Sequence, residues 1–166
     1  MKSEYDIHDI IRYYPYILGE EFESLDLKHE KIYEDRTRAD FVFSSNQKSI
    51  VVEVKKGYID EEMLNQATYY LNNESKENPG KTLKGVLVGR RKPGSLGFVS
   101  NFEHSGYTFE AKLLDIDLPM KIRLCDKCRK VNDKSSTVCK YCGSKKFVID
   151  PFLFSMKYQR RNMSNR

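Results

Sequence analysis

The amino-acid sequence predicts an α/β protein, in which helices flank a mixed central β-sheet and a small metal-binding module follows. Three observations carry this prediction. Two apolar runs, residues 41–43 and 50–54, flank a polar turn, which is the pattern of a β-hairpin. Residues 59–71 show helical spacing and are followed by strand-like residues 83–89 and 107–113. Four cysteines form two C-x-x-C pairs near the C-terminus.

The first segment, residues 6–18, predicts a helix whose apolar side chains fall at helical spacing. Pro15 should kink or end this helix, because proline lacks the backbone N–H and clashes with the preceding turn. Residues 25–33 alternate loosely and predict a first strand at an edge of the sheet. His29 on this strand is expected to be partly exposed, and residues 34–38 form a charged loop.

The hairpin of residues 40–55 is the centre of the predicted fold. A turn centred on Asn46 and Gln47 sets Asp40 opposite Glu53, with Cβ atoms roughly 5 Å apart. Lys55 lies two residues beyond Glu53 and therefore shares its face of the strand. Two opposed carboxylates repel unless a cation neutralises them, and Mg²⁺ prefers such oxygen ligands. The alternative is a solvated face with ordinary cross-strand ion pairs.

The segment after the hairpin predicts a helix, a strand, a second helix and a last strand. Ile59, Met63, Gln66 and Tyr70 form one stripe of the first helix. The strand at residues 83–89 runs into the basic cluster Arg90, Arg91 and Lys92, at the strand end where open α/β sheets bind ligands. A short helix is expected from Pro93 to Phe102 or His104, and a half-buried strand at residues 107–113.

The two C-x-x-C pairs predict a zinc ribbon. Four thiolates at this spacing form a closed tetrahedral site, so the expected Zn²⁺ is structural. An iron–sulfur cluster is the minor alternative, and disulfides are disfavoured by an expected reducing compartment. Few apolar residues lie between Leu124 and Val148, so metal binding should supply the folding free energy of the module. The predicted ligands are Cys125, Cys128, Cys139 and Cys142.

Asp40 followed by Glu53-Val54-Lys55 resembles the signature of the PD-(D/E)XK nuclease superfamily, with Ala39-Asp40 in place of the usual Pro-Asp. Together with Arg38, the V-V-E-V-K strand and the Q-x-x-x-Y element at Gln66 and Tyr70, the pattern is similar to NucS/EndoMS-type and archaeal Holliday-junction-resolvase-like nucleases. The resemblance covers roughly residues 5–118. It implies a restriction-endonuclease-like core.

The resemblance also implies a reaction, the Mg²⁺- or Mn²⁺-dependent hydrolysis of DNA phosphodiester bonds by an endonuclease. Asp40 and Glu53 would hold the ion, and Lys55 would orient the attacking water. A glutamate of the first helical region is expected to help, Glu21 before Glu20, and Gln66 is expected as a further helper. Arg38 and Tyr70 are expected to contact nucleic acid.

The charge distribution supports a nucleic-acid partner. Residues 119–166 carry 13 Lys/Arg against 3 Asp, whereas residues 1–118 carry 16 Lys/Arg against 21 Asp/Glu, out of 29 and 24 in the whole chain. A carboxylate-rich part joined to a basic part suits a metal site with a nucleic-acid clamp. The expected contacts are Arg90, Arg91, Lys92, Lys127, Arg129 and Lys130.

The expected organisation is a nuclease-like core at residues 1–118, a zinc ribbon at 119–150 and a C-terminal tail at 151–166. The start of the chain has no apolar segment typical of a signal peptide, and no run is long enough for a membrane helix, which predicts a cytoplasmic protein. A homodimer is expected through residues 107–113 and 152–158. A non-catalytic binding module and an RNA nuclease stay open as alternatives, as do the favoured substrate structure and the pathway.

Overall fold

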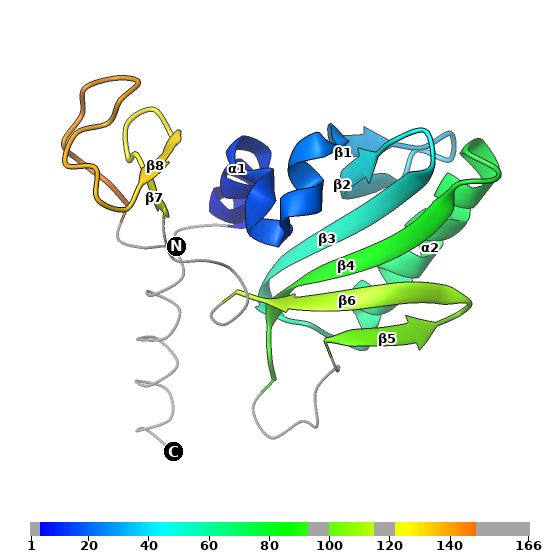
Figure 1. The fold of residues 1–166 in the computed structure, drawn as a ribbon. Helices are drawn as coiled ribbons and strands as arrows, with labels where there is room; N and C mark the ends of the chain where they lie inside the picture. Colours follow the sequence, from blue (N-terminus) through cyan, green and yellow to red (C-terminus); the bar gives the residue numbers. More distant parts are fainter. Residues whose placement is uncertain (1–3, 93–99, 115–121, 149–166) are drawn as a thin grey trace, which may run out of the picture.

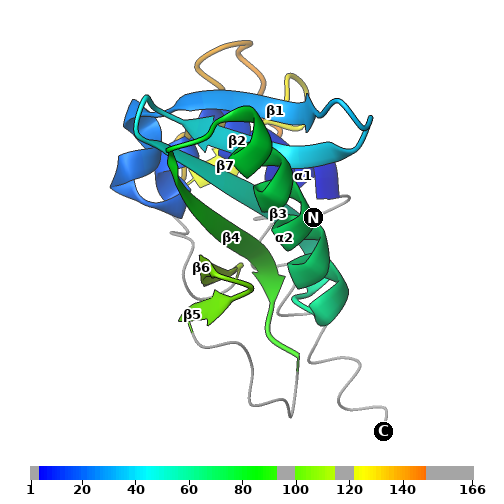
Figure 2. The same cartoon turned by 90° about the vertical axis from the view of Figure 1, so that its right-hand side faces the viewer.

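The computed structural model describes residues 4–92, 100–114 and 122–148. Its centre is a six-stranded mixed sheet in the order β1-β2-β3-β4-β6-β5, with helices on both faces (Figures 1 and 2). A separate two-stranded sheet, β7 Ile122–Leu124 and β8 Val131–Asp133, adjoins the loops that hold the cysteines. This confirms the predicted fold class. The strands of the large sheet are β1 Asp26–Ile32, β2 Arg38–Ser44, β3 Lys48–Tyr58, β4 Thr82–Arg90, β5 Asn101–His104 and β6 Tyr107–Leu113.

The β2–β3 hairpin has the predicted register. The strands are antiparallel, their paired residues run from Ser44 and Ser49 to Phe41 and Val52, and Asn46 and Gln47 lie at the centre of the turn. Strand β3 then pairs in parallel with β4, and β4 in parallel with β6. The outer strands β1 and β5 run antiparallel to their neighbours, which makes the sheet mixed. The hairpin strand β3 is therefore central, as its apolar composition predicts.

Helix α2, Glu61–Glu77, covers one face of the sheet (Figure 2). It begins after Asp60, whose carboxylate accepts a hydrogen bond from the backbone N–H of Met63 at 3.0 Å. Glu61 and Glu62 in its first turn are favoured by the helix dipole. Its apolar stripe packs on strand residues such as Val51, Leu87 and Phe109.

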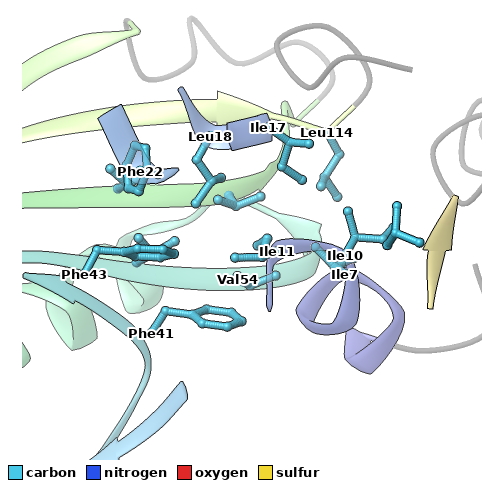
Figure 3. Packing of buried hydrophobic residues seen from close by; sticks show 14 of the residues in the cluster. Ile7, Ile10, Ile11, Ile17, Leu18, Phe22, Phe41, Phe43, Val54 and Leu114 are labelled. Atoms are coloured by element: carbon cyan, nitrogen blue, oxygen red, sulfur yellow. The ribbon is translucent and has the colours of Figure 1, made fainter. Parts of the chain in front are cut away.

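Helix α1, Glu4–Tyr13, and two short 3-10 helices, Pro15–Leu18 and Glu20–Ser24, cover the opposite face. The helix ends just before Pro15, as predicted. Burial of its isoleucines against the phenylalanines of β2 removes apolar surface from water and fixes the helix on the sheet. Figure 3 shows these side chains in one cluster, which includes Ile7, Ile10, Ile11, Phe22, Phe41, Phe43 and Val54.

The helix expected to reach Phe102 or His104 is wrong at its end, because Asn101–His104 is strand β5. Residues 93–99, where that helix was expected to begin, lie outside the described residues. Ser105 and Gly106 both have positive φ, 51° and 81°, and form the turn that returns the chain as β6. The ring of Phe102 stacks on Phe109 at 5.5 Å. A Ser-Gly pair before an alternating segment is a hairpin signal that the sequence does contain.

The cysteine-bearing unit packs against α1 (Figure 1). Its strands are β7 Ile122–Leu124 and β8 Val131–Asp133, and an isolated bridge joins Cys125 to Phe147. Leu124, Val131 and Val148 belong to the same buried cluster as the isoleucines of α1. The unit therefore shares its apolar core with the N-terminal helix. Among the described residues, no helix has the length and apolar character needed to cross a membrane.

Candidate active site and cysteine cluster

A pocket of about 190 Å³ opens where the β2–β3 hairpin meets the start of α2. Four residues predicted from the sequence line it together: Asp40, Glu53, Lys55 and Gln66. They come from three elements, because β2 supplies Asp40, β3 supplies Glu53 and Lys55, and α2 supplies Gln66. The remaining lining residues are Glu4, Val54, Glu62 and Met63.

The two carboxyl groups take the place of ladder hydrogen bonds at this end of the hairpin. The backbone N–H of Asp40 donates to Glu53 Oε1 at 3.1 Å. The backbone N–H of Val54 donates to Asp40 Oδ2 at 2.8 Å. Each carboxyl group is thus held by the main chain, with oxygen atoms left to face the pocket.

Burial makes two negative charges at this point costly. Glu53 is only 4% exposed. Burial raises the pKa of Glu53, and the neighbouring charge of Asp40 raises it further. Burial also raises the pKa of Asp40, although the N–H of Val54 opposes the shift. The pair therefore retains a proton near neutral pH unless a cation compensates both carboxylates.

Lys55 is held by the residue that caps helix α2. Its Nζ donates to Asp60 Oδ2 at 2.5 Å, while Asp60 Oδ1 accepts from the N–H of Met63. This hydrogen bond with Lys55 lowers the pKa of Asp60. Both side chains are more than a third exposed, so the ion pair is accessible to water and to a ligand in the pocket.

Gln66 is held toward the pocket by Tyr70, because its Nε2 donates to the tyrosine hydroxyl at 2.9 Å. The ring of Tyr70 is 5% exposed and stacks on Tyr33 at 5.8 Å. A ring in this position offers no face to a nucleic acid. The nucleic-acid contact expected at Tyr70 stays a prediction, and in the structure the Tyr70 hydroxyl supports Gln66.

The structure does not bring Glu21 into the pocket. Its carboxylate accepts from Lys48 Nζ at 2.6 Å and lies 3.9 Å from Lys84 Nζ. Lys48 begins β3 beside the hairpin turn, and Lys84 of β4 pairs with Ile50, so both lie at the end of the sheet away from the pocket. Glu20 is also exposed on the same 3-10 helix as Glu21. The glutamate that lines the pocket is Glu4 of α1, whose Oε2 accepts from the N–H of Lys56 at 3.0 Å.

His8 is a second residue that the sequence analysis missed. It lies one helical turn after Glu4, and its Nε2 is 3.8 Å from Asp40 Oδ2. Its Nδ1 is 3.1 Å from Nε2 of His29 on β1, and burial lowers the pKa of both histidines. The i, i+4 spacing of Glu4 and His8 was the available signal, because it places both on one face of a helix.

The residues of the large sheet that were expected to contact nucleic acid lie near the start of β2 and the end of β4. Arg38 is exposed and lies 3.4 Å from Glu30. Arg90 ends β4 and pairs in the ladder with Tyr58. Arg91 and Lys92 follow it and are exposed.

In the cysteine-bearing unit, Lys127 is exposed, and Lys130 lies over the exposed ring of Tyr141 with its Nζ 4.8 Å from the ring centre. Lys140 flanks the same ring at 5.1 Å. Arg129 is different, because its guanidinium forms an ion pair with the fully buried Asp6 of α1. The nucleic-acid contact expected for Arg129 stays a prediction, and in the structure its guanidinium makes a contact within the protein.

The four cysteines meet in one cluster, as the C-x-x-C spacing predicts. One ligand atom from each lies within 4.8 Å of the others, and the sulfur atoms of the pairs Cys125–Cys142 and Cys128–Cys139 are 3.6 Å apart. Four thiol sulfurs at this separation suit a tetrahedral ion with metal–sulfur bonds near ~2.3 Å. The positive φ of Gly143, 70°, follows the second knuckle. The donor set fits a structural zinc ribbon.

Neither the protein-family models nor the curated proteins yield a match to this chain. Two of the solved structures that match this chain cover only part of it. One is a repair endonuclease from Pyrococcus abyssi, with 21% identity over 57% of this chain and 41% of that chain, at a TM-score of 0.46. The other is an assembly of Thermococcus gammatolerans McrB AAA+ hexamers with bound McrC, with 15% identity over 66% of this chain and 26% of that chain, at a TM-score of 0.41. This chain spans less than half the length of either matched chain.

Proposed function

We propose that this protein is a metal-dependent endonuclease that hydrolyses DNA phosphodiester bonds in repair, recombination or defence. The observation that carries the proposal is the pocket in which Asp40, Glu53 and Lys55 converge. The buried carboxyl group of Glu53 and the partly buried one of Asp40, beside the accessible Lys55, form a site that can bind a cation and an anion together. A phosphodiester held by a divalent ion presents both charges.

The residues present fit Mg²⁺ or Mn²⁺. Asp40 and Glu53 supply hard oxygen ligands, and the Val54 carbonyl is a third candidate, since Val54 also lines the pocket. Bound there, such an ion supplies Lewis-acid activation of the phosphodiester and of water. The backbone hydrogen bonds to Asp40 and Glu53 hold the two ligands in fixed positions.

Lys55 supplies positive charge where negative charge develops on the phosphate oxygens during hydrolysis. It reaches a substrate by leaving Asp60, an exchange of one exposed ion pair for another. Gln66, held by Tyr70, can orient water or a phosphate oxygen at the same pocket. Glu4 closes the pocket from α1 and, in this proposal, takes the part that the sequence resemblance suggested for Glu21.

The cysteine cluster is proposed to hold one structural Zn²⁺, and the basic residues around it to bind the DNA backbone. Lys130 and Lys140 lie over the exposed ring of Tyr141, and Lys127 is an exposed residue of the same unit. The division into residues 1–118, 119–150 and 151–166 stays a proposal, as does the homodimer. The predicted dimer contacts at residues 152–158 lie outside the described residues.

Cleavage of a mixed panel of branched, mismatched, duplex and single-stranded DNA with Mg²⁺ tests the proposal. Asp40→Asn, Glu53→Gln and Lys55→Met should each reduce the rate by at least about 100-fold, as removal of a transition-state contact does. Glu61→Gln is the matched control, because Glu61 is exposed in the same helix turn as Glu62 but does not line the pocket. A wild-type rate of cleavage in the double variant Asp40→Asn/Glu53→Gln would refute the assignment of these residues to the active site. Cleavage of RNA but not of DNA would show that the substrate is RNA.

A further inference from the structure

The first cysteine knuckle is joined to helix α1 by an ion pair whose carboxylate is buried and whose guanidinium is partly exposed. Arg129 directly follows Cys128 and has a positive φ of 61°. Its guanidinium pairs with Asp6, which is 0% exposed, and its Nε lies 4.0 Å from Asp9. A carboxylate buried to this degree needs its cation, so the seating of α1 depends on where the knuckle puts Arg129.

The knuckle fixes Arg129 through the main chain. The N–H of Arg129 donates to the Cys125 carbonyl at 3.1 Å, and the N–H of Cys125 donates to the Lys130 carbonyl at 3.0 Å. The N–H of Cys128 donates to Cys125 Sγ at 3.5 Å. A metal ion that ties together the four sulfurs would hold this turn in shape. Without it, a segment of this size with so little core of its own would lose its geometry.

Helix α1 faces the pocket with its other side. Glu4 and His8 are one turn apart and share a face, whereas Asp6 lies between them in sequence and points to the opposite side of the helix. Glu4 lines the pocket, and His8 reaches within 3.8 Å of Asp40. The helix is therefore clamped between Arg129 on one side and the carboxylates of the hairpin on the other.

We propose that Arg129 and Asp6 are positioning residues through which the metal-loaded ribbon holds Glu4 and His8 against the Asp40–Glu53 site. The ribbon is then part of the site's architecture in addition to being a basic surface for DNA. This proposal rests on the proposed function for its effect on metal binding. The docking of α1 by the ribbon can be measured without it.

Two measurements on the full chain test the proposal. Hydrogen exchange reports the protection of α1, with β3 as the internal reference for an intact sheet. Electron paramagnetic resonance titration with Mn²⁺ reports the pocket, with Asp40→Asn defining which Mn²⁺ belongs to it. The variants are Arg129→Ala, Arg129→Lys and the pair Cys125→Ser/Cys128→Ser. Lys145→Ala is the control, because Lys145 is an exposed cation of the same unit.

In Arg129→Ala, zinc content should stay at one per chain, while α1 amides exchange at least about 10-fold faster and β3 is unchanged. The Kd for Mn²⁺ should rise about 10-fold, with Arg129→Lys between Arg129→Ala and the wild type, and Lys145→Ala equal to the wild type. The cysteine variant should loosen α1 in the same way. If that variant fails to fold, Arg129→Ala alone decides the outcome.

Unchanged α1 exchange in Arg129→Ala overturns the proposal. So does a loosened α1 with an unchanged Kd for an Asp40-dependent Mn²⁺. A wild type with no Asp40-dependent Mn²⁺ overturns the proposed function and, with it, the effect proposed on the site. Faster α1 exchange in Arg129→Ala would in that case still support the docking half of the proposal.

Discussion

The side chains of Asp40 and Glu53 each accept a hydrogen bond from the backbone of the neighbouring strand, where a regular ladder would join backbone to backbone. Asp40 gives its N–H to Glu53 Oε1, and Asp40 Oδ2 receives the N–H of Val54, the residue after Glu53. The last paired residues before them are Phe41 and Val52. The strands thus continue side by side, but carboxyl groups occupy the space of the next ladder bonds. The backbone hydrogen bonds therefore hold two carboxyl groups next to each other, although burial disfavours their charged forms.

Replacing Glu53 should stabilise the metal-free protein at high pH. The pKa of Glu53 is raised above its ordinary value of 4.5, because burial and Asp40 disfavour its charged form. A raised pKa contributes stability that is fully present below the ordinary value and is lost as the pH rises through the folded-state pKa. Glu53→Gln, which stays neutral, should therefore melt at least about 3 °C higher than the wild type at about pH 8.5 and nearly the same at about pH 5. Thermal melts in EDTA at the two pH values measure this. If the wild type and Glu53→Gln melt at the same temperature at both pH values, ionisation of Glu53 does not destabilise the folded protein.

Binding of a divalent cation should release protons. The raised pKa values of Asp40 and Glu53 mean that the metal-free pair retains a proton near neutral pH, which the ion must displace. Affinity for Mn²⁺ should therefore rise with pH between about 6 and 8. Calorimetric titrations in buffers of different ionisation enthalpy count the protons released. A count of zero, or an affinity independent of pH, contradicts the prediction.

Two substitutions of Asp60, to Ala and to Asn, should separate its role as the cap of helix α2 from its ion pair with Lys55. Asn caps a helix about as well as Asp, whereas Ala costs about 1 kcal/mol at this position. Asp60→Ala should therefore lower the melting temperature by about 2–4 °C, while Asp60→Asn should not. Because Asp60→Asn also releases Lys55 from an exposed ion pair, kcat/KM for DNA should rise about 2- to 5-fold. A fall in kcat/KM with Asp60→Asn would instead mean that Asp60 holds Lys55 in its working position.

The basic side of the cysteine-bearing unit should bind DNA with a salt dependence that reports each lysine. Lys130→Ala and Lys140→Ala should each reduce the slope of log K against log salt by about 0.7–0.9, if each lysine contacts one phosphate. Lys76→Ala on α2 is the control, since Lys76 is exposed on another element. Fluorescence anisotropy over a series of salt concentrations measures the slopes. If the slopes of the two variants equal that of the control, Lys130 and Lys140 do not contact DNA phosphates and the DNA-binding surface lies elsewhere on the protein.

The sequence predicts the centre of this fold better than its periphery. The hairpin register follows from local turn chemistry and alternation, so Asp40, Glu53 and Lys55 could be placed together before the structure was known. The cluster of the four cysteines could be predicted equally well, because their spacing in the sequence reflects one metal-binding geometry. Both predictions use residues close in sequence.

The sequence could not place residues that meet through long-range packing. Glu21 lies in an acidic segment near the right place in the chain, but the 3-10 helix that carries it packs by the hairpin turn, next to Lys48. Glu4 reaches the pocket because α1 crosses the sheet at the other end. Arg129 has the composition of a phosphate contact, and only its position against Asp6 shows that its charge is used inside the protein. No local pattern encodes these distances.

The contact between α1 and the ribbon also sets the order in which the molecule can be completed during synthesis. The hydroxyl of Tyr14, the residue that follows α1, donates to Oδ1 of Asp133 on β8 at 3.5 Å, although Asp133 comes 119 residues later in the chain. The whole six-stranded sheet lies between the two in sequence, so Asp6 of α1 can meet Arg129 only after all of that sheet has been synthesised. Contacts this distant in sequence form late, because the loop between them must close first. Helix α1 therefore reaches its final place only after the cysteine-bearing unit has been made, and a chain cut before that unit would lack the Arg129 that pairs with Asp6.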